Sequence, residues 1–157
     1  LAAKFGLPYA FASHFPPTHL LDAIATYRNE FQPSEQLTEP YAMAGINVIA
    51  SETEEDAERQ RVDVSRRRIA RFVTPSRELS PAEADDLLAS PQGQQIAQMM
   101  HYTAAGTAET VHRYLENFAE AVGVDELMTV HPSPTIVERL RSIDLLADAR
   151  DAVSIAV

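Results

Sequence analysis

The feature that most limits how this chain can fold is the alternation of short apolar runs with longer amphipathic segments. Residues 9–13 and 42–50 are short, apolar and uncharged, as buried strands are, and residues 125–130 read as a third strand. Each run is followed by apolar residues at helical spacing, for example Leu20, Ile24, Tyr27 and Phe31. Strands that alternate with helices run parallel, because each crossover needs room for a helix. The sequence therefore predicts an α/β fold whose three strands are parallel and adjacent in sequence order.

Capping and breaking residues place the ends of the predicted helices. Gly6 follows what reads as the last turn of a helix, and Gly123 closes the amphipathic helix that begins after Thr107. Ser51 and Glu54 have the spacing of a capping box, which predicts the start of the helix that follows the second strand. Two further helices are expected to open at residues 16–18 and 133–134. Residues 96–102 are read as one more helical piece.

Residues 74–93 break the repeating pattern. Three prolines and scattered acidic residues leave this segment without a continuous apolar face, although residues 81–89 could form a short helix. We therefore expect one domain over residues 1–157 with a surface insertion at about 74–93. This insertion is predicted to be the most mobile internal segment, and a lid is its most interesting possible role.

Composition excludes several classes of function. The chain has 13 Lys and Arg residues against 23 Asp and Glu residues, and its net charge of -10 disfavours nucleic acid and anionic membranes as partners. The longest apolar run is about half the length that a membrane-spanning helix needs. The absence of cysteine excludes disulfides and thiolate chemistry, and suits a cytoplasmic protein. Redox chemistry would therefore require a bound cofactor.

Five segments in collinear order carry a resemblance to a known family. They are Leu-Pro-Tyr-Ala-Phe-Ala-Ser-His-Phe at 7–15, the strand at 41–50, Gly-Thr-Ala-Glu-Thr-Val at 106–111, Gly-Val-Asp-Glu-Leu-Met at 123–128 and Arg-Leu-Arg-Ser at 139–142. Together they resemble the C-terminal part of flavin-dependent monooxygenases of the bacterial luciferase-like family. The resemblance implies about strands six to eight of a TIM (β/α)8 barrel. Since the counterparts of strands one to five are absent and Leu1 opens in mid-element, we expect a piece of a longer protein that is inactive alone.

The resemblance also implies an activity and its cofactor. The complete protein would oxygenate an organic small molecule with reduced FMN and dioxygen, and a separate flavin reductase could supply the FMN. A deazaflavin-dependent oxidoreductase of the same superfamily and a noncatalytic half-barrel scaffold remain open as alternatives. The exposed strand edges of a half barrel predict a homo-oligomer. The substrate stays unidentified, because most of its pocket would lie in the other half.

Candidate site residues follow from the rule that barrel enzymes act at the C-terminal ends of their strands. His14 is the candidate catalytic residue, because an imidazole can donate or accept a proton near neutral pH. Ser13, Gly106 and Thr107 are candidates for cofactor binding, the last two because a helix N-terminus attracts anions. Phe15 and His131 are candidates for substrate binding. The histidines lack metal-ligand spacing and the serines lack a nucleophile elbow, so neither a metal site nor a hydrolase is predicted.

Overall fold

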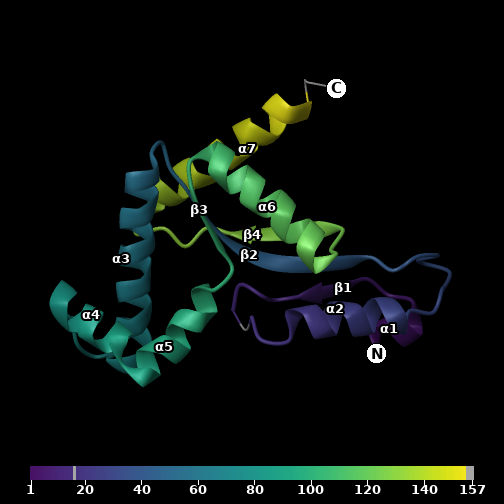
Figure 1. Ribbon diagram of the computed structural model, residues 1–157, viewed down its shortest axis with the longest axis horizontal. Coiled ribbons are helices and arrows are strands. Elements are labelled where there is room, and N and C mark those ends of the chain that lie inside the picture. The colour runs from purple at the N-terminus through teal and green to yellow at the C-terminus, as the bar shows by residue number, and fades with distance from the viewer. Residues whose placement is uncertain (16, 155–157) are drawn as a thin grey trace.

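The centre of the structure is the strand β2 (Ala42–Ala50), around which the other elements are arranged (Figure 1). The computed structural model of the chain describes residues 1–15 and 17–154. All residues of β2 except Met43 are buried. Its small and β-branched residues suit a strand that is covered on both faces. The predicted boundaries of this strand are confirmed.

The sheet is parallel, and β2 is flanked on both edges. Strand β4 (Glu126–Val130) pairs with one edge, while β1 (Tyr9–Phe11) and β3 (Thr103–Gly106) share the other. The peptide group of Asn47 bonds toward β3 and that of Ala42 toward β4, as alternate residues of a strand do. The predicted parallel order of β1, β2 and β4 is therefore confirmed. The sequence analysis missed β3, which continues the edge where the three-residue β1 stops.

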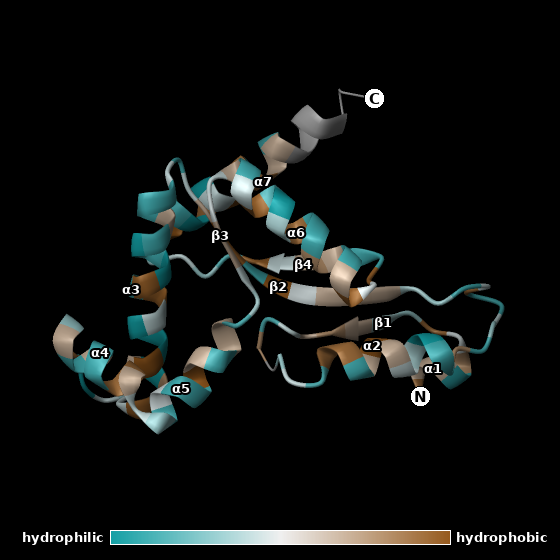
Figure 2. Ribbon diagram, in the orientation of Figure 1, coloured by the Kyte–Doolittle hydropathy of each residue, from teal (hydrophilic) through white to brown (hydrophobic). Residues whose placement is uncertain are grey.

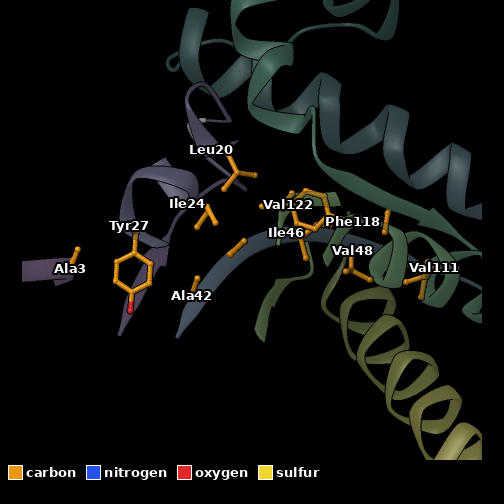
Figure 3. Packing of buried hydrophobic residues seen from close by; sticks show 13 residues of the cluster. Ala3, Leu20, Ile24, Tyr27, Ala42, Ile46, Val48, Val111, Phe118 and Val122 are labelled. Carbon is orange, nitrogen blue, oxygen red and sulfur yellow. The ribbon is translucent and has the colours of Figure 1, made fainter. Parts of the chain in front are cut away.

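The side chains of β2 divide between two faces. Ala42, Ala44, Ile46, Val48 and Ala50 face the helices and form the main apolar core with residues of α2 (Leu20–Asn29) and α6 (Ala108–Val122) (Figure 3). We call this the helix-covered face. Full burial of a core Leu, Ile or Phe contributes about 1.5–3 kcal/mol each, so this contact fixes how the helices lie on the sheet.

The opposite side of the sheet is here called the second face, and it is formed by Met43, Gly45, Asn47 and Ile49 of β2 with their in-register neighbours. Strand β4 places the half-exposed Met128 beside Gly45 on this face. Gly45, Asn47 and Ile49 are buried, whereas Met43 is only partly so. The second face is therefore covered toward the carboxyl ends of the strands and open toward their amino ends.

Helix ends mostly follow their sequence signals. Helix α1 (Ala2–Phe5) ends at Gly6 and α6 ends at Gly123, both in the left-handed conformation with φ of 61° and 73°. Helix α2 begins after His19, whose φ of 69° is also left-handed, instead of at residues 16–18. Pro16 itself lies outside the described residues. Helix α7 (Ile136–Ser154) follows β4 and packs against α6 and β2.

The predicted capping box at Ser51 and Glu54 is wrong. The N-cap of α3 (Glu54–Val73) is Thr53, whose hydroxyl accepts a hydrogen bond from the Asp56 N–H at 3.1 Å. The Ser51 N–H donates to the Gly106 carbonyl at 3.0 Å, and its hydroxyl donates to Asp56. Pairing with β3 thus holds residue 51 in the sheet, and the helix begins later.

Three helices gather beyond the carboxyl ends of the strands, namely α3, α4 (Pro81–Ala89) and α5 (Pro91–Ala97) (Figure 1). The predicted helix at 81–89 is confirmed, and Ser80 with Glu83 forms its capping box. Arg66 of α3 binds Asp85 of α4 through two contacts of 2.7 Å. Figure 2 shows hydrophilic residues recurring along α3, in contrast to the mostly pale to brown strands β1 and β2. Residues 96–102, read as one helical piece, comprise the end of α5, the 3-10 helix η1 (Gln98–Met100) and a bend that leads into β3.

None of the helices in residues 1–15 and 17–154 is both long and apolar enough to cross a membrane.

Candidate functional site

The loops that leave the strands gather at one edge of the sheet, because β1, β2 and β4 are parallel. Ser13, Ser51 and His131 all follow the carboxyl ends of their strands, as the sequence predicted. Since Phe11 pairs with Ala44 and Val130 with Asn47, the loops after β1 and β4 begin beside the middle of β2. Ser51 therefore lies farther along than the other two.

Ser13 is a buried link between this edge and the sheet. Its side chain is fully buried, and the hydroxyl donates to the Gly45 carbonyl at 2.5 Å. The Ser13 N–H donates to the Phe11 carbonyl at 2.9 Å, and this turn ends β1 two residues before the predicted boundary. The hydroxyl of this predicted cofactor-binding residue is thus used to hold the loop that carries His14.

The imidazole of His14 lies against Gly45 on the second face. A Cβ atom on Gly45 would lie 2.1 Å from the His14 Nδ1, so only glycine leaves room for this ring. The Nδ1 atom is buried and has no hydrogen-bond partner among the described residues. A buried polar atom without a partner is costly, and one is often found where a ligand or water binds. His14 therefore has the free capacity that a binding or proton-transfer residue needs.

Asn47 is a candidate site residue that the sequence analysis did not identify. Its buried amide group donates to the carbonyls of His14, Met99 and Tyr102 at 3.1–3.5 Å, which joins the loop after β1 to the segment that precedes β3. Its Oδ1 atom has no partner among the described residues. The available signal was a single polar side chain in an otherwise apolar strand. Because burying a polar group is costly, such a residue indicates a structural or functional role.

Gly106 and Thr107 lie where a carboxylate of the chain itself already occupies the start of α6. Glu54 accepts hydrogen bonds from the Thr107 N–H at 3.1 Å, the Thr107 hydroxyl at 2.9 Å and the Thr110 hydroxyl at 2.7 Å. These bonds, that from Thr110 first, hold the pKa of Glu54 below its usual value. Gly106 has a φ of 149°, and a Cβ there would lie 2.6 Å from Glu54. The anion expected at this helix N-terminus is thus supplied by Glu54.

His131 lies on the opposite side of the sheet from His14, which differs from its expected place at a shared pocket. Thr129 pairs with Ile46 on the helix-covered face, and the His131 ring contacts the Thr129 hydroxyl at 3.3 Å. The Ser142 hydroxyl accepts from the Ala50 N–H at 2.9 Å and is hydrogen-bonded to the His131 Nδ1 at 2.8 Å, in a direction set by the tautomer of the ring. Burial, with a smaller contribution from Arg139, lowers the pKa of His131. This histidine is a structural link between β4, α7 and β2.

Phe15 borders a cavity at the carboxyl edge. The side chain is half exposed, and the cavity of about 550 Å³ also has Phe72 of α3 and Pro132 of the loop after β4 among its lining residues. Of the predicted residues, Phe15 lines this cavity, and His14 precedes it in the same loop. Clusters of three or more His, Cys, Asp or Glu side chains able to hold a metal ion do not occur within the described part of the chain.

Comparison with curated proteins confirms the predicted resemblance. The chain is 34% identical over 157 residues to a luciferase-like monooxygenase of Escherichia coli strain K12, covering 96% of this chain and 46% of that protein. It is 35% identical over 154 residues to the uncharacterized protein YvbT of Bacillus subtilis, covering 94% and 45%. The chain is related to luciferase-like monooxygenases and spans about half the length of the curated relatives it matches. A search of protein-family models found no match.

Solved structures agree with the sequence comparison. The crystal structure of apo-MsnO8 superposes with a TM-score of 0.72 at 28% identity, over 94% of this chain and 46% of that one. Riboflavin lyase RcaE, solved with modified FMN and riboflavin, has a TM-score of 0.56 at 14% identity and covers 99% of this chain and 41% of its own. The latter likeness shows the fold alone.

Proposed function

Since this chain is related to luciferase-like monooxygenases over nearly its whole length, we propose that it forms part of a flavin-dependent monooxygenase. In this proposal β1, β2 and β4 correspond to about strands six to eight of a TIM barrel, and the second face is the inside of the barrel. The observation that carries the proposal is the pair of buried polar atoms without partners on that face, His14 Nδ1 and Asn47 Oδ1. The His14 Nδ1 can donate or accept a hydrogen bond, depending on its tautomer, and the Asn47 Oδ1 can accept one. The two atoms could therefore bind each other or a ligand with matching groups.

The residues of this chain would position and protonate, while the flavin would supply the oxygen chemistry. Oxygenation of an organic substrate by dioxygen is the chemistry that reduced FMN would supply when bound. His14 would donate or accept a proton through Nδ1, the atom that faces Gly45. Asn47 would hold the backbone of His14 in place through the bond to its carbonyl. Ser13 would keep the same loop on β2 through the bond from its hydroxyl to the Gly45 carbonyl.

Gly106 and Thr107 would act on the cofactor only indirectly in this proposal. Because Glu54 already accepts the hydrogen bonds of Thr107 and lies against Gly106, these two residues would fix the start of α6 at the rim and leave flavin contacts to other groups. His131 would support β4 and α7 from the helix-covered face. Phe15 would contact an organic substrate at the cavity. A flavin reductase would supply the reduced cofactor, and the complete protein would act in the cytoplasm.

The test is a chimera in which this chain replaces the matching portion of the Escherichia coli luciferase-like monooxygenase. The chimera should bind reduced FMN, and His14→Ala should weaken that binding about tenfold through loss of a buried hydrogen bond. His112→Ala, on the outer helix α6, is the matched control and should bind FMN normally.

Different outcomes separate the competing functions. Binding of a deazaflavin in place of FMN, without consumption of dioxygen, would favour the deazaflavin-dependent oxidoreductase. A folded chimera that binds neither cofactor would contradict the proposal and favour a noncatalytic scaffold. Equal weakening by His14→Ala and His112→Ala would remove His14 from the site while leaving the flavin assignment standing.

A further inference from the structure

The cavity beside Phe15 is lined by an unusual concentration of positive charge. It lies between the second half of α3, the loop after β1 and the loop after β4, with a volume of about 550 Å³. Its apolar lining consists of Phe15, Val64, Phe72 and Pro132, and Ser133 adds a hydroxyl. The remaining lining residues are Arg67, Arg68, Arg71 and Arg139. We call this site the arginine pocket.

Four arginines in one pocket are unexpected in a chain with 13 basic and 23 acidic residues. No acidic residue lines the pocket within the described part of the chain. Within the described part of the chain, Arg68, Arg71 and Arg139 form no ion pair. Arg67 donates a hydrogen bond to the Pro134 carbonyl. Glu138 of α7, one residue before Arg139, is paired with Arg59 at 2.6 Å.

Other arginines of α3 behave differently, which rules out a general property of this helix. Arg59 pairs with Asp56 and Glu138, and Arg66 pairs with Asp85. Arg61 pairs with Glu58. A solvated charged face would show such pairs along its length. Where α3 borders the cavity they are missing, so the positive charge there is uncompensated by the described residues.

Two further observations indicate that a ligand would relieve this arrangement. The Ser133 Oγ is buried and has no hydrogen-bond partner among the described residues. Burial, and then the charge of Arg71, lower the pKa of Arg68. The two guanidinium groups therefore repel each other in a partly dry site, and an anion placed between them would turn repulsion into attraction.

We propose that the arginine pocket binds the phosphate or carboxylate group of a small organic ligand whose apolar part lies against Phe15 and Phe72. Guanidinium groups bind both kinds of oxyanion through paired hydrogen bonds, and the Ser133 hydroxyl would add a donor. The cavity volume suits a small molecule, and the overall negative charge opposes a polyanion. This inference goes beyond the proposed function and does not depend on it, because anion binding can be measured without flavin chemistry.

Calorimetric titration of the purified chain with inorganic phosphate and phenyl phosphate tests the proposal at low ionic strength. Both should bind saturably, and phenyl phosphate should bind more tightly because its ring meets the aromatic lining. Arg68→Gln should weaken both ligands about tenfold, as expected for loss of one charge-assisted contact. Phe15→Ala should weaken phenyl phosphate and leave inorganic phosphate unchanged.

Arg61→Gln is the matched control, since it removes the same charge from the same helix outside the pocket. It should leave binding of both ligands within about twofold of the parent chain, because exposed charges act weakly through water. Arg71→Gln, at an exposed position, keeps the test valid if Arg68→Gln fails to fold. Absence of saturable binding to the parent chain, or equal weakening by Arg61→Gln and Arg71→Gln, would overturn the proposal.

FMN and riboflavin show where the anion comes from. If FMN binds, riboflavin does not, and Arg68→Gln abolishes the difference, the anion is the phosphate of the cofactor. If Arg68→Gln weakens phenyl phosphate and leaves FMN and riboflavin equally affected or equally unbound, the anion belongs to a substrate. Either result supports anion binding by the arginine pocket. If the arginine pocket binds no anion, the flavin assignment is still tested separately by the chimera.

Discussion

The imidazole of His14 occupies the space that a side chain on Gly45 would fill on the second face, so the position of each residue depends on the other. Because a Cβ on Gly45 would lie 2.1 Å from the His14 Nδ1, Gly45→Ala must displace the imidazole. We expect a loss of about 1–3 kcal/mol in the free energy of unfolding, typical of overpacking in a buried site. In the His14→Ala background the same change should cost less than half as much. Urea denaturation of the four proteins gives this coupling, and equal costs in both backgrounds would contradict the contact.

His131 predicts a pH dependence of stability. Its pKa is lowered in the folded chain, so between the unfolded value of 6.5 and the lower folded value the unfolded chain binds more protons. The contribution of His131 is therefore fully present above pH 6.5 and is lost as the pH falls through the folded pKa. Unfolding measured between pH 7.5 and 5 should show this loss in the parent chain and a smaller one in His131→Gln. Identical slopes would contradict the assignment.

Glu54 joins two elements, since it sits in the first turn of α3 and receives three hydrogen bonds from the start of α6. Glu54→Gln removes the negative charge next to the N-termini of both helices, where it is favourable. We expect a lower melting temperature. Glu55→Gln, one position along the same turn, is the control and should change the melting temperature less. A larger effect at Glu55 would show that simple helix-end charge, and not this link, matters.

The mobility predicted for the insertion at 74–93 is a property of its helices and can be tested at the level of these elements. The structure places α4 and the first residues of α5 in this segment, and most of its residues are exposed, with Ala84 and Gly93 as buried exceptions. Few buried apolar contacts mean a low free energy of local opening. Amide hydrogen exchange should therefore be faster in residues 74–93 than in α6, whose apolar side packs in the core. Equal protection of the two segments would contradict the prediction.

At the scale of the whole molecule, the open part of the second face and the edge of β4 that pairs with no strand among the described residues predict self-association. Met128 is 54% exposed on this face, and α7 adds a stripe of exposed apolar residues, namely Ile136, Val137, Leu140 and Ile143. Exposed strand edges and apolar patches both favour association. The mass of the chain in solution should rise with concentration. Met128→Glu should lower the associated fraction, whereas Leu21→Glu, at a residue 56% exposed on α2, should not. A monomer at all concentrations would contradict this prediction.

The chain by itself is also expected to bind its cofactor poorly. Only a few hydrogen bonds are available from His14 and its neighbours, and each contributes about 1 kcal/mol. We therefore expect the chain by itself to bind FMN weakly or not at all. Fluorescence titration at known oligomeric state would check this, and micromolar binding by a monomer would contradict it.

The sequence by itself determined the class of fold, the order of β1, β2 and β4, and the helix ends at Gly6 and Gly123. These features depend on local patterns of apolar residues and on glycines, which adopt the left-handed backbone conformation readily because they have no Cβ atom. The resemblance to luciferase-like monooxygenases was equally readable, because it rests on motifs in collinear order.

Only the tertiary structure decided which side of the sheet each candidate residue occupies. His14 and His131 both follow a strand, yet one lies against Gly45 and the other is held by Ser142, 11 residues farther along. Glu54 meets Thr107 across 53 residues, and Asn47 gathers carbonyls from two distant segments. The arginine pocket likewise joins α3 to the loops after β1 and β4. Contacts between distant segments depend on how strands pair and helices pack, and no local pattern of residues specifies them.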